Sequence, residues 1–173
     1  MSSFWFTEAY KRLFLPAGLF GQSLDALALN LPNAASATRL KADLYVANSS
    51  FVATNDTLMD ITSIASLQAV TGLAKHQGAS YVSKNITAVA LAVDNTLNKV
   101  TFTPTPTSFS WLALEAATAG YTLRALVGRY DNGAGIDLPV FWYDGGNVIG
   151  LPMLGGDVNV SLPALAPGRS QMV

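Results

Sequence analysis

The stretch YTLRALVGRYDNGAGIDLPVFWYDGGNVIGLPMLGGDVNVS, residues 121–161, decides the fold. It contains three apolar runs, Leu123–Tyr130, Pro139–Tyr143 and Val158–Leu162, separated by glycine-rich breaks. The breaks begin with Asp131-Asn132-Gly133 and Asp144-Gly145, and such pairs supply positive φ at low steric cost. Short aromatic or β-branched runs bounded by turn residues are typical of strands. We therefore predict a β-meander at the centre of a single β-domain.

Further strands are indicated on the N-terminal side of this stretch. Leu40–Ala47 alternates apolar and polar residues, which predicts a strand with one buried face. Tyr81–Ala92 and Lys99–Thr103 follow as two strands joined through a turn, and Phe109–Leu114 resumes an alternating pattern. The prolines at positions 104 and 106 are expected to end the pairing of the strand before them. About eight or nine short strands with one helix favour an all-β fold, a β-sandwich of the jelly-roll type.

Thr7–Leu15 is the best helix candidate, because Thr7 can cap it and Pro16 ends it. We expect it to cover an open end of its own domain. The alternative is an anchor that docks the preceding aromatic residues, Phe4, Trp5 and Phe6, into a neighbouring subunit. Leu24–Leu31 fits a helix or a strand, and we favour an irregular connection that ends in a short strand.

Two segments are expected to lie outside the regular core. Residues 48–77 form a long polar excursion that carries surface loops, within which Asp56–Ala65 fits one helical turn or a short strand. Residues 163–173 contain two prolines and a glycine and are predicted to form an extended arm. The sequence thus indicates one domain over residues 1–162, followed by this arm.

The amino-acid composition limits the classes of function that are possible. Half of the 173 residues are hydrophobic and only 12% are charged, against roughly 25% in typical globular domains. So little charge predicts exposed apolar surface, which in proteins usually marks sites of interaction with other chains. The net charge of −1 with no basic run argues against nucleic-acid binding. The absence of cysteine excludes disulfides and thiolate metal sites.

The N-terminus lacks the basic start and apolar core of a signal peptide, and no stretch has about 20 consecutive apolar residues. We therefore expect a protein that is made in a cytoplasm, does not enter a membrane and stays soluble until it finds its partner.

No catalytic constellation is evident in the sequence. His76 is the only histidine and has no cysteine or carboxylate cluster near it in sequence, so we interpret it as a loop histidine rather than a metal ligand or general base. Four aspartates recur at turn positions, where turn chemistry accounts for them: Asp131, Asp137, Asp144 and Asp157. We predict no enzyme activity, no metal and no cofactor.

The glycine pairs and the aromatic residues each admit a binding interpretation. Gly145-Gly146 and Gly155-Gly156 lack the Lys-Ser/Thr that would follow in a phosphate-binding loop. Trp111, Trp142 and Tyr143 fit a sugar-binding face, but aromatic residues buried in a sandwich are the commoner arrangement. A carbohydrate-binding module therefore stays an alternative.

Seven segments follow one another in a distinctive order. The clearest are FSWLAL (residues 109–114), YTLRALVGRYDNG (121–133), LPVFWYDGG (138–146) and LPMLGGDVNVSL (151–162). The others are TEAYKRLFL (7–15), LKADLYVANSSF (40–51) and YVSKNITAVALAVDNTLNKVTFT (81–103). This order resembles that of small tailed-bacteriophage virion proteins. In this pattern a Trp-containing strand precedes two strands that end in aromatic-Asp turns, and a Gly-Gly-Asp-Val-x-Val strand closes the domain.

The resemblance implies a non-enzymatic sandwich or jelly-roll subunit of a virion, made in the host cytoplasm. It favours a head decoration or cement protein that contacts the major capsid protein and copies of itself, commonly as a homotrimer. A tail, baseplate or fibre-base subunit is the alternative. From composition we place the contacts on the aromatic N-terminus, the 48–77 excursion and the arm, with the candidate interface residues Phe4, Trp5, Phe6, Phe51, Pro163 and Pro167.

Overall fold

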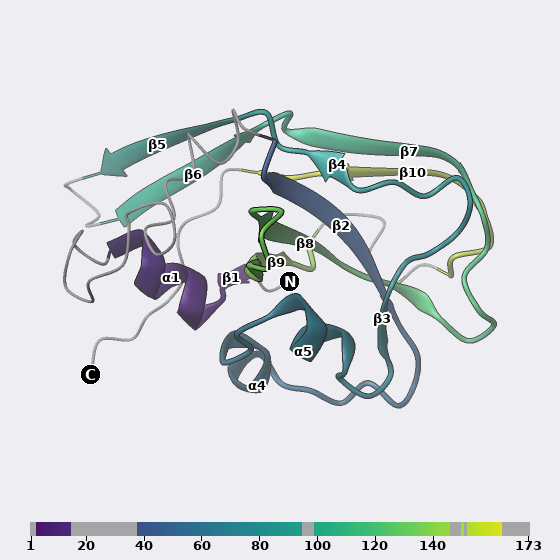
Figure 1. The fold of residues 1–173 in the computed structure, drawn as a ribbon. Helices are drawn as coiled ribbons and strands as arrows, with labels where there is room; N and C mark the ends of the chain where they lie inside the picture. The colour runs from purple at the N-terminus through teal and green to yellow at the C-terminus, as the bar shows by residue number, and fades with distance from the viewer. Residues whose placement is uncertain (1–2, 15–37, 95–98, 146–149, 151, 164–173) are drawn as a thin grey trace.

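A computed structural model describes residues 3–14, 38–94, 99–145, 150 and 152–163 of the chain. Within them lie ten strands and three short helices (Figure 1). The helices are α1 (Thr7–Phe14), α4 (Asn55–Met59) and α5 (Ile64–Gln68). The strands are β1 (Ser3–Trp5), β2 (Leu40–Ala47), β3 (Leu73–Lys75), β4 (Lys84–Asn85), β5 (Ala88–Asp94), β6 (Lys99–Thr105), β7 (Ser108–Leu114), β8 (Thr122–Asp131), β9 (Asp137–Tyr143) and β10 (Gly156–Ser161).

An antiparallel sheet of six strands forms the centre of the molecule. Its order is β1-β9-β8-β2-β3, and β4 pairs with β2 beside β3. β2 coincides with the predicted strand, and β8 and β9 form a predicted hairpin of the central stretch. In the hairpin turn, the side-chain oxygen of Asn132 accepts the backbone N–H groups of Ala134 and Ile136. The prediction of an all-β fold is confirmed.

The predicted three-stranded meander is wrong in its third member. β10 does not continue from β9; it pairs antiparallel with β7, so that Val160 lies opposite Phe109. β5 and β6 form a second two-stranded ribbon. The prediction that Pro104 ends strand pairing is also wrong, because Pro104 lies inside β6 opposite Val89. Proline is tolerated in a strand that has a neighbour on just one side, because no backbone N–H group has to donate from the other edge.

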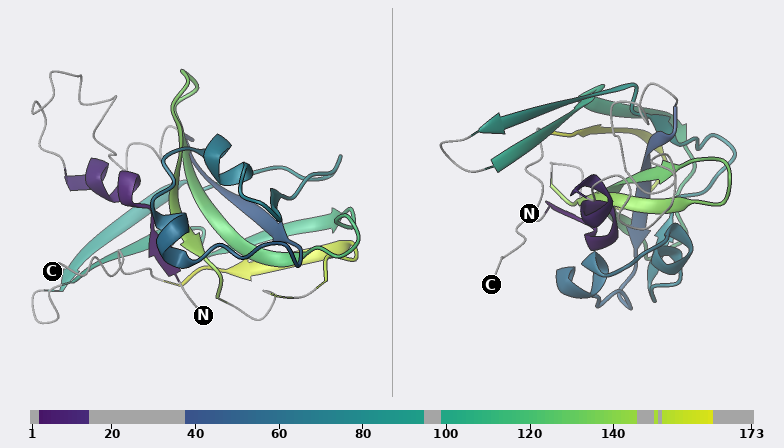
Figure 2. Two further views of the ribbon diagram at one scale, coloured as in Figure 1. Left: turned by 90° about the horizontal axis from the view of Figure 1, so that it is seen from below. Right: turned by 60° about the vertical axis from the view of Figure 1, so that its left-hand side comes forward.

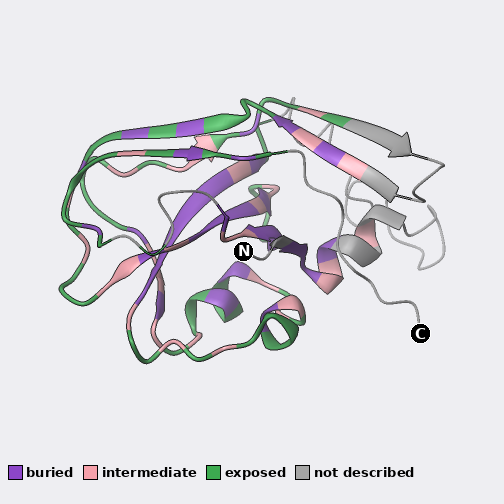
Figure 3. Ribbon diagram, turned by 180° about the vertical axis from the view of Figure 1, so that it is seen from behind, coloured by how far each residue is buried: buried purple, intermediate pink, exposed green. Residues whose placement is uncertain are grey.

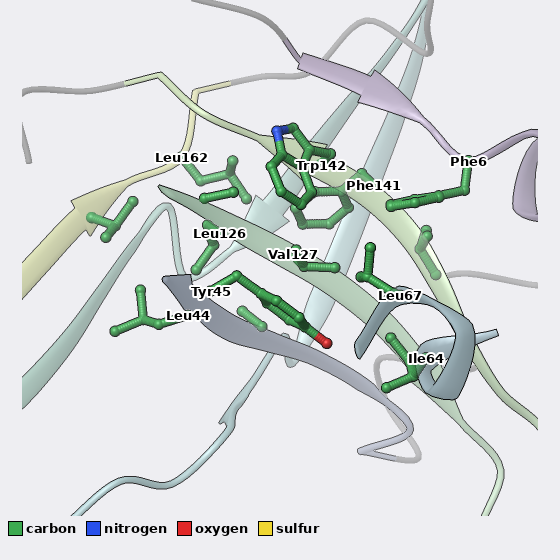
Figure 4. Close-up of a cluster of buried hydrophobic side chains, with 14 of the residues drawn as sticks. Phe6, Leu44, Tyr45, Ile64, Leu67, Leu126, Val127, Phe141, Trp142 and Leu162 are labelled. Carbon is green, nitrogen blue, oxygen red and sulfur yellow. The ribbon is translucent and has the colours of Figure 1, made fainter. Parts of the chain in front are cut away.

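The central sheet is covered on both faces. The two ribbons lie across one face, and α4 and α5 lie against the other (Figures 1 and 2). In Figure 4, Leu44 and Leu126 point toward the ribbon side, where Leu162 lies, whereas Tyr45 and Val127 point toward α5. Coloured by burial, the middle strands are mainly purple (Figure 3). β2 is therefore buried along both faces, and the predicted solvent-facing side of this strand faces the helical layer instead.

The 48–77 excursion builds that helical layer. Thr54 and Ser63 cap α4 and α5, and each side chain accepts a backbone N–H three residues later. Ile64 and Leu67 of α5 are buried, as is Leu58 of α4. The region predicted as one helical turn or a short strand, residues 56–65, holds most of α4 and the first two residues of α5, so the helical alternative is correct. The excursion is part of the fold rather than a set of surface loops alone.

The N-terminal helix is confirmed over Thr7–Phe14, and Leu15, the last residue of the predicted span, lies outside the described residues. It packs near β9, and the preceding residues form β1 at the edge of the sheet. The predicted connection at 24–31 and the arm from residue 164 onward lie outside the described residues. Of the two arm prolines, Pro163 is described and exposed, and Pro167 is not described.

Candidate functional site

The most unusual chemistry in the described part of the chain is a charged group in the interior. Asp43 of β2 is fully buried. Nζ of Lys75, from β3, lies 2.9 Å from its Oδ1, and Nε of Arg129, from β8, lies 2.8 Å from its Oδ2. A buried carboxylate requires such partners, because an unpaired charge in the interior is very unfavourable.

Two hydroxyl groups also donate to one oxygen of this carboxylate. Tyr81 donates to Oδ1 of Asp43 at 3.0 Å, and Ser83 donates to the same oxygen. The Tyr81 hydroxyl also accepts the backbone N–H of Leu44 at 2.9 Å, and the N–H of His76 donates to the Leu44 carbonyl. β3 pairs with one end of β2 and β4 with the other, so these contacts satisfy the backbone of Leu44 in the gap between them.

Arg129 extends the network to the β8–β9 hairpin. Its Nη1 donates to Asp137 at 2.8 Å and lies 3.5 Å from Asp131, which also pairs with Lys41 at 3.4 Å. Burial opposes the charge on Arg129, but the surrounding carboxylates outweigh it and raise the pKa of the guanidinium. The N–H of Gly133 is the main cause that lowers the pKa of Asp131, assisted by the two cations.

The network contains the residue types of a serine–lysine nucleophile, since Nζ of Lys75 lies 3.1 Å from Oγ of Ser83. Catalysis would require the lysine to act as a base. Here Nζ of Lys75 donates to the Ser83 hydroxyl and also pairs with Asp43, so it is placed as a donor in this network. Burial, followed by the charge of Asp43, raises the pKa of Tyr81. The ion pairs thus link β2, β3 and β8, although Oδ2 of Asp43 and Nε of Arg129 make no hydrogen bond among the described residues.

His76 lies in a loop directly after β3, as the sequence predicted, but its side chain is buried. It is 1% exposed, its ring meets Tyr81 edge-on at 5.3 Å, and its Nε2 has no hydrogen-bond partner among the described residues. Burial lowers the pKa of the imidazole, and the nearby Glu115 opposes this effect. A pocket of about 250 Å³ adjoins it, lined by Val46, Ala74, Lys75, His76, Gln77, Ala116, Ala117, Thr118 and Tyr121.

The predicted contact residues at the N-terminus lie inside the chain's own core. Phe4, Trp5 and Phe6 are 5%, 3% and 0% exposed, so in this structure they offer almost no surface to a neighbour. The reason is their strand pairing, which sets Phe4 opposite Trp142 and Trp5 opposite Phe141. This placement corrects the anchor interpretation and agrees with the favoured one, in which the N-terminal segment covers its own domain.

Trp142 has no open face for a sugar. It is fully buried, with the Phe4 ring stacked at 6.0 Å and the Phe51 ring stacked at 6.4 Å. The guanidinium of Arg124 lies 5.4 Å from the centre of the Phe51 ring. Phe51 is thus half-buried and contacts side chains of β8 and β9. Trp111 is also buried, and its Nε1 donates to the carbonyl of Val82.

The remaining predicted positions behave as turn and pairing residues. Asp157 accepts the backbone N–H of Ala113 at 2.9 Å, where Ala113 has a φ of 50°. Asp144 lies 3.6 Å from Arg124. Within the described residues no group of three or more His, Cys, Asp or Glu side chains is placed to hold a metal ion. In the same part of the chain, no helix has the length and apolar character needed to cross a membrane.

Sequence reasoning missed the Asp43 network. The only local signal was Lys41, Asp43 and Tyr45 at alternate positions of β2, a pattern that is also typical of a solvent-facing strand. The partners come from β3, β8 and the 81–83 segment, which the sequence does not place beside β2. No protein-family model, curated protein or solved structure matches this chain.

Proposed function

We propose that this protein is a structural subunit of a bacteriophage particle, which acts by burying apolar surface against neighbouring subunits. The finer proposal is a decoration or cement protein of the head with a jelly-roll type of sandwich. The resemblance of its element order to small virion proteins supports this role. Two β-ribbons laid across a six-stranded sheet are compatible with such an architecture.

The observation that carries the proposal is a surface poor in charge that exposes large apolar side chains. Val52, Leu112 and Leu154 are 84%, 66% and 82% exposed although both faces of the central sheet are covered. The described ion pairs also occupy about half of the ten basic and eleven acidic residues. Charged residues make up only 12% of the chain, and this composition suits a surface that becomes covered.

The free energy from such contacts is sufficient to hold neighbouring subunits together. Burying about 400 Å² of apolar surface contributes about 10 kcal/mol before the loss of translational freedom is subtracted. Repetition around a symmetric particle multiplies weak contacts into stable attachment. We assign the contacts to the 48–77 excursion and to the segment after β10. Of the candidate contact residues in these two segments, the structure describes Phe51 and Pro163. A tail, baseplate or fibre-base position is the alternative location.

The charged network favours a structural role over hydrolysis. A glycosidase needs two carboxylates with free oxygens facing a substrate. Here Asp43 and Asp137 both pair with the same arginine, and Asp43 also binds Lys75. We assign these residues to holding the sheet in register.

Cosedimentation with undecorated phage heads tests the proposal. The wild-type protein should pellet with heads, and Leu112→Asp should weaken this binding if the outer face of β7 contributes. Ser108→Asp is the matched control, because it places the same charge at another exposed position of β7. Wild-type protein that stays in the supernatant with every head preparation would contradict the head assignment and favour the tail alternative.

A further inference from the structure

The β5–β6 ribbon has an edge that the described part of the chain leaves unpaired. Each strand pairs only with the other among the described residues, and the ribbon extends beyond the central sheet (Figures 1 and 2). It is held to the body by Phe102, whose ring lies edge-on to Trp5 at 5.1 Å and 5.6 Å from Phe141. Unpaired edges bind other strands readily unless a protein blocks them.

The pairing register shows which backbone groups face outward on β5. Val89 lies opposite Pro104, and proline has no N–H to donate. Val89 and Pro104 therefore form a pair that exchanges no backbone hydrogen bonds. In such a pair the N–H and C=O groups of Val89 point away from β6. Because the register is continuous to Asp94, the same holds at alternate residues, Leu91 and Val93.

The two edges of the ribbon differ in protection. Pro104 removes a donor from the outer edge of β6, which is a common way to block strand addition. β5 has no such residue, since Ala88–Val93 contains neither proline nor a charged side chain. Long uncharged edge strands are unusual at the surface of an isolated protein. The β5 edge thus has the properties of a contact surface.

We propose that β5 pairs antiparallel with β5 of a second copy of this chain, about a two-fold axis at Leu91. In this register Val89 pairs with Val93 of the partner subunit, and Leu91 pairs with its own counterpart. The three outward-facing positions then exchange about six backbone hydrogen bonds. The two ribbons become one four-stranded sheet that continues across both chains.

The residues of the edge favour a second copy. Two-fold pairing about Leu91 sets Val89 opposite Val93 of the partner subunit and leucine opposite leucine, so apolar residues meet at all three outward positions. Asp94, the one charged residue of β5, falls opposite Ala88 of the partner subunit. No like charges meet, and Ala88 is exposed in the single chain.

Light scattering on the purified full chain tests this inference. We expect a mass twice the 18.2 kDa of the chain. Leu91→Pro should give a monomer, because it removes an outward N–H and leaves the bonds to β6 in place. Val100→Pro is the matched control: Val100 lies opposite Val93, so it makes the same change on the other edge of the same ribbon and should stay dimeric.

A charge pair provides a second test that does not depend on proline. Ala88→Asp places two carboxylates opposite each other in the dimer and should weaken dimerisation in low salt. Asp94→Lys added to this variant should restore it. A wild-type monomer, a trimer unaffected by Leu91→Pro, or slow hydrogen exchange at Val89 and Val93 in a monomer would each overturn the inference.

This contact deepens the proposed function by naming one self-contact of the subunit. The mass measurement needs no phage particle, whereas head binding is measured by cosedimentation, so the two proposals fail separately. A dimer that ignores heads contradicts only the decoration role, and a monomer that binds heads contradicts only the β5 contact.

Discussion

Nε of Arg129 lies 2.8 Å from Oδ2 of Asp43, in the interior between neighbouring strands β2 and β8. The carboxylate is completely buried, and Lys75 pairs with its other oxygen. Replacing a whole buried ion pair by apolar residues is often neutral, but removing one partner leaves an uncompensated charge. The relationship therefore makes the fold sensitive to any change at Asp43 alone.

Asp43→Asn is predicted to lower the free energy of unfolding by about 3–5 kcal/mol, because two cations lose their anionic partner. Urea denaturation followed by circular dichroism measures the change. Asp60→Asn is the matched control at an exposed position, with an expected effect below about 0.5 kcal/mol. Equal effects at both positions would show that the network does not stabilise the fold.

Gly128→Ala is predicted to destabilise the protein by about 1–3 kcal/mol through overpacking. A Cβ atom at this position would lie 2.1 Å from the ring of Phe141, which packs over the glycine from the paired strand. Phe102 and Trp5 lie against the same ring, so it has little room to move. Combining Gly128→Ala with Phe141→Leu should cost less than the sum of the single changes. Simple additivity in this cycle would contradict the steric explanation.

Stability is predicted to fall as the pH is lowered below about 6.5, the ordinary pKa of histidine in an unfolded chain. The pKa of His76 is lowered in the folded state, so the unfolded state binds more protons between the two pKa values. The loss should end once the pH passes below the folded pKa.

His76→Gln should remove this pH dependence, and the chain contains no other histidine to confuse the measurement. The lowered pKa values of Glu115 and Asp131 act in a separate range, because their contributions are lost only as the pH falls below about 4.5. NMR titration of the imidazole ring gives the folded pKa directly. A value at or above 6.5 would contradict the prediction.

Ser63→Ala is predicted to lower the free energy of unfolding by about 1 kcal/mol through loss of the α5 cap. The Ser63 hydroxyl accepts the backbone N–H of Ser66 at 3.1 Å. Ser66→Ala is the control, since it keeps this acceptor and removes only the contact between the two hydroxyls. Thermal unfolding of both variants measures the difference. A control that loses as much stability as Ser63→Ala would contradict a capping role.

The sequence predicted elements better than their partners. The strand at 40–47, the hairpin of β8 and β9 and the helix at 7–14 follow from local periodicity, turn residues and a capping residue. The partner of β10 is β7, which no local pattern encodes, because strand pairing depends on which faces need covering. The meander prediction failed for this reason.

The buried network around Asp43 was not predicted for the same reason, because a local pattern does not show what covers each face of a strand. Alternation in β2 indicates that Asp43 and Tyr45 share a face, but not whether that face meets water or another layer. Two short helices of the 48–77 excursion cover it, and each is too short to produce a clear periodic signal. The loop position of His76 was predicted correctly, but its burial was not, because nothing in its neighbouring sequence shows that its ring is enclosed.

The heat stability of undecorated phage heads, measured with and without saturating protein, tests the proposed function most directly. A subunit that buries apolar surface across junctions between capsid subunits stabilises the closed shell, so bound protein should raise the melting temperature of the heads. The same addition of Asp43→Asn protein, destabilised as predicted, should protect less at high temperature. Heads that melt at an unchanged temperature despite saturating wild-type protein would contradict the proposal that this chain cements the head.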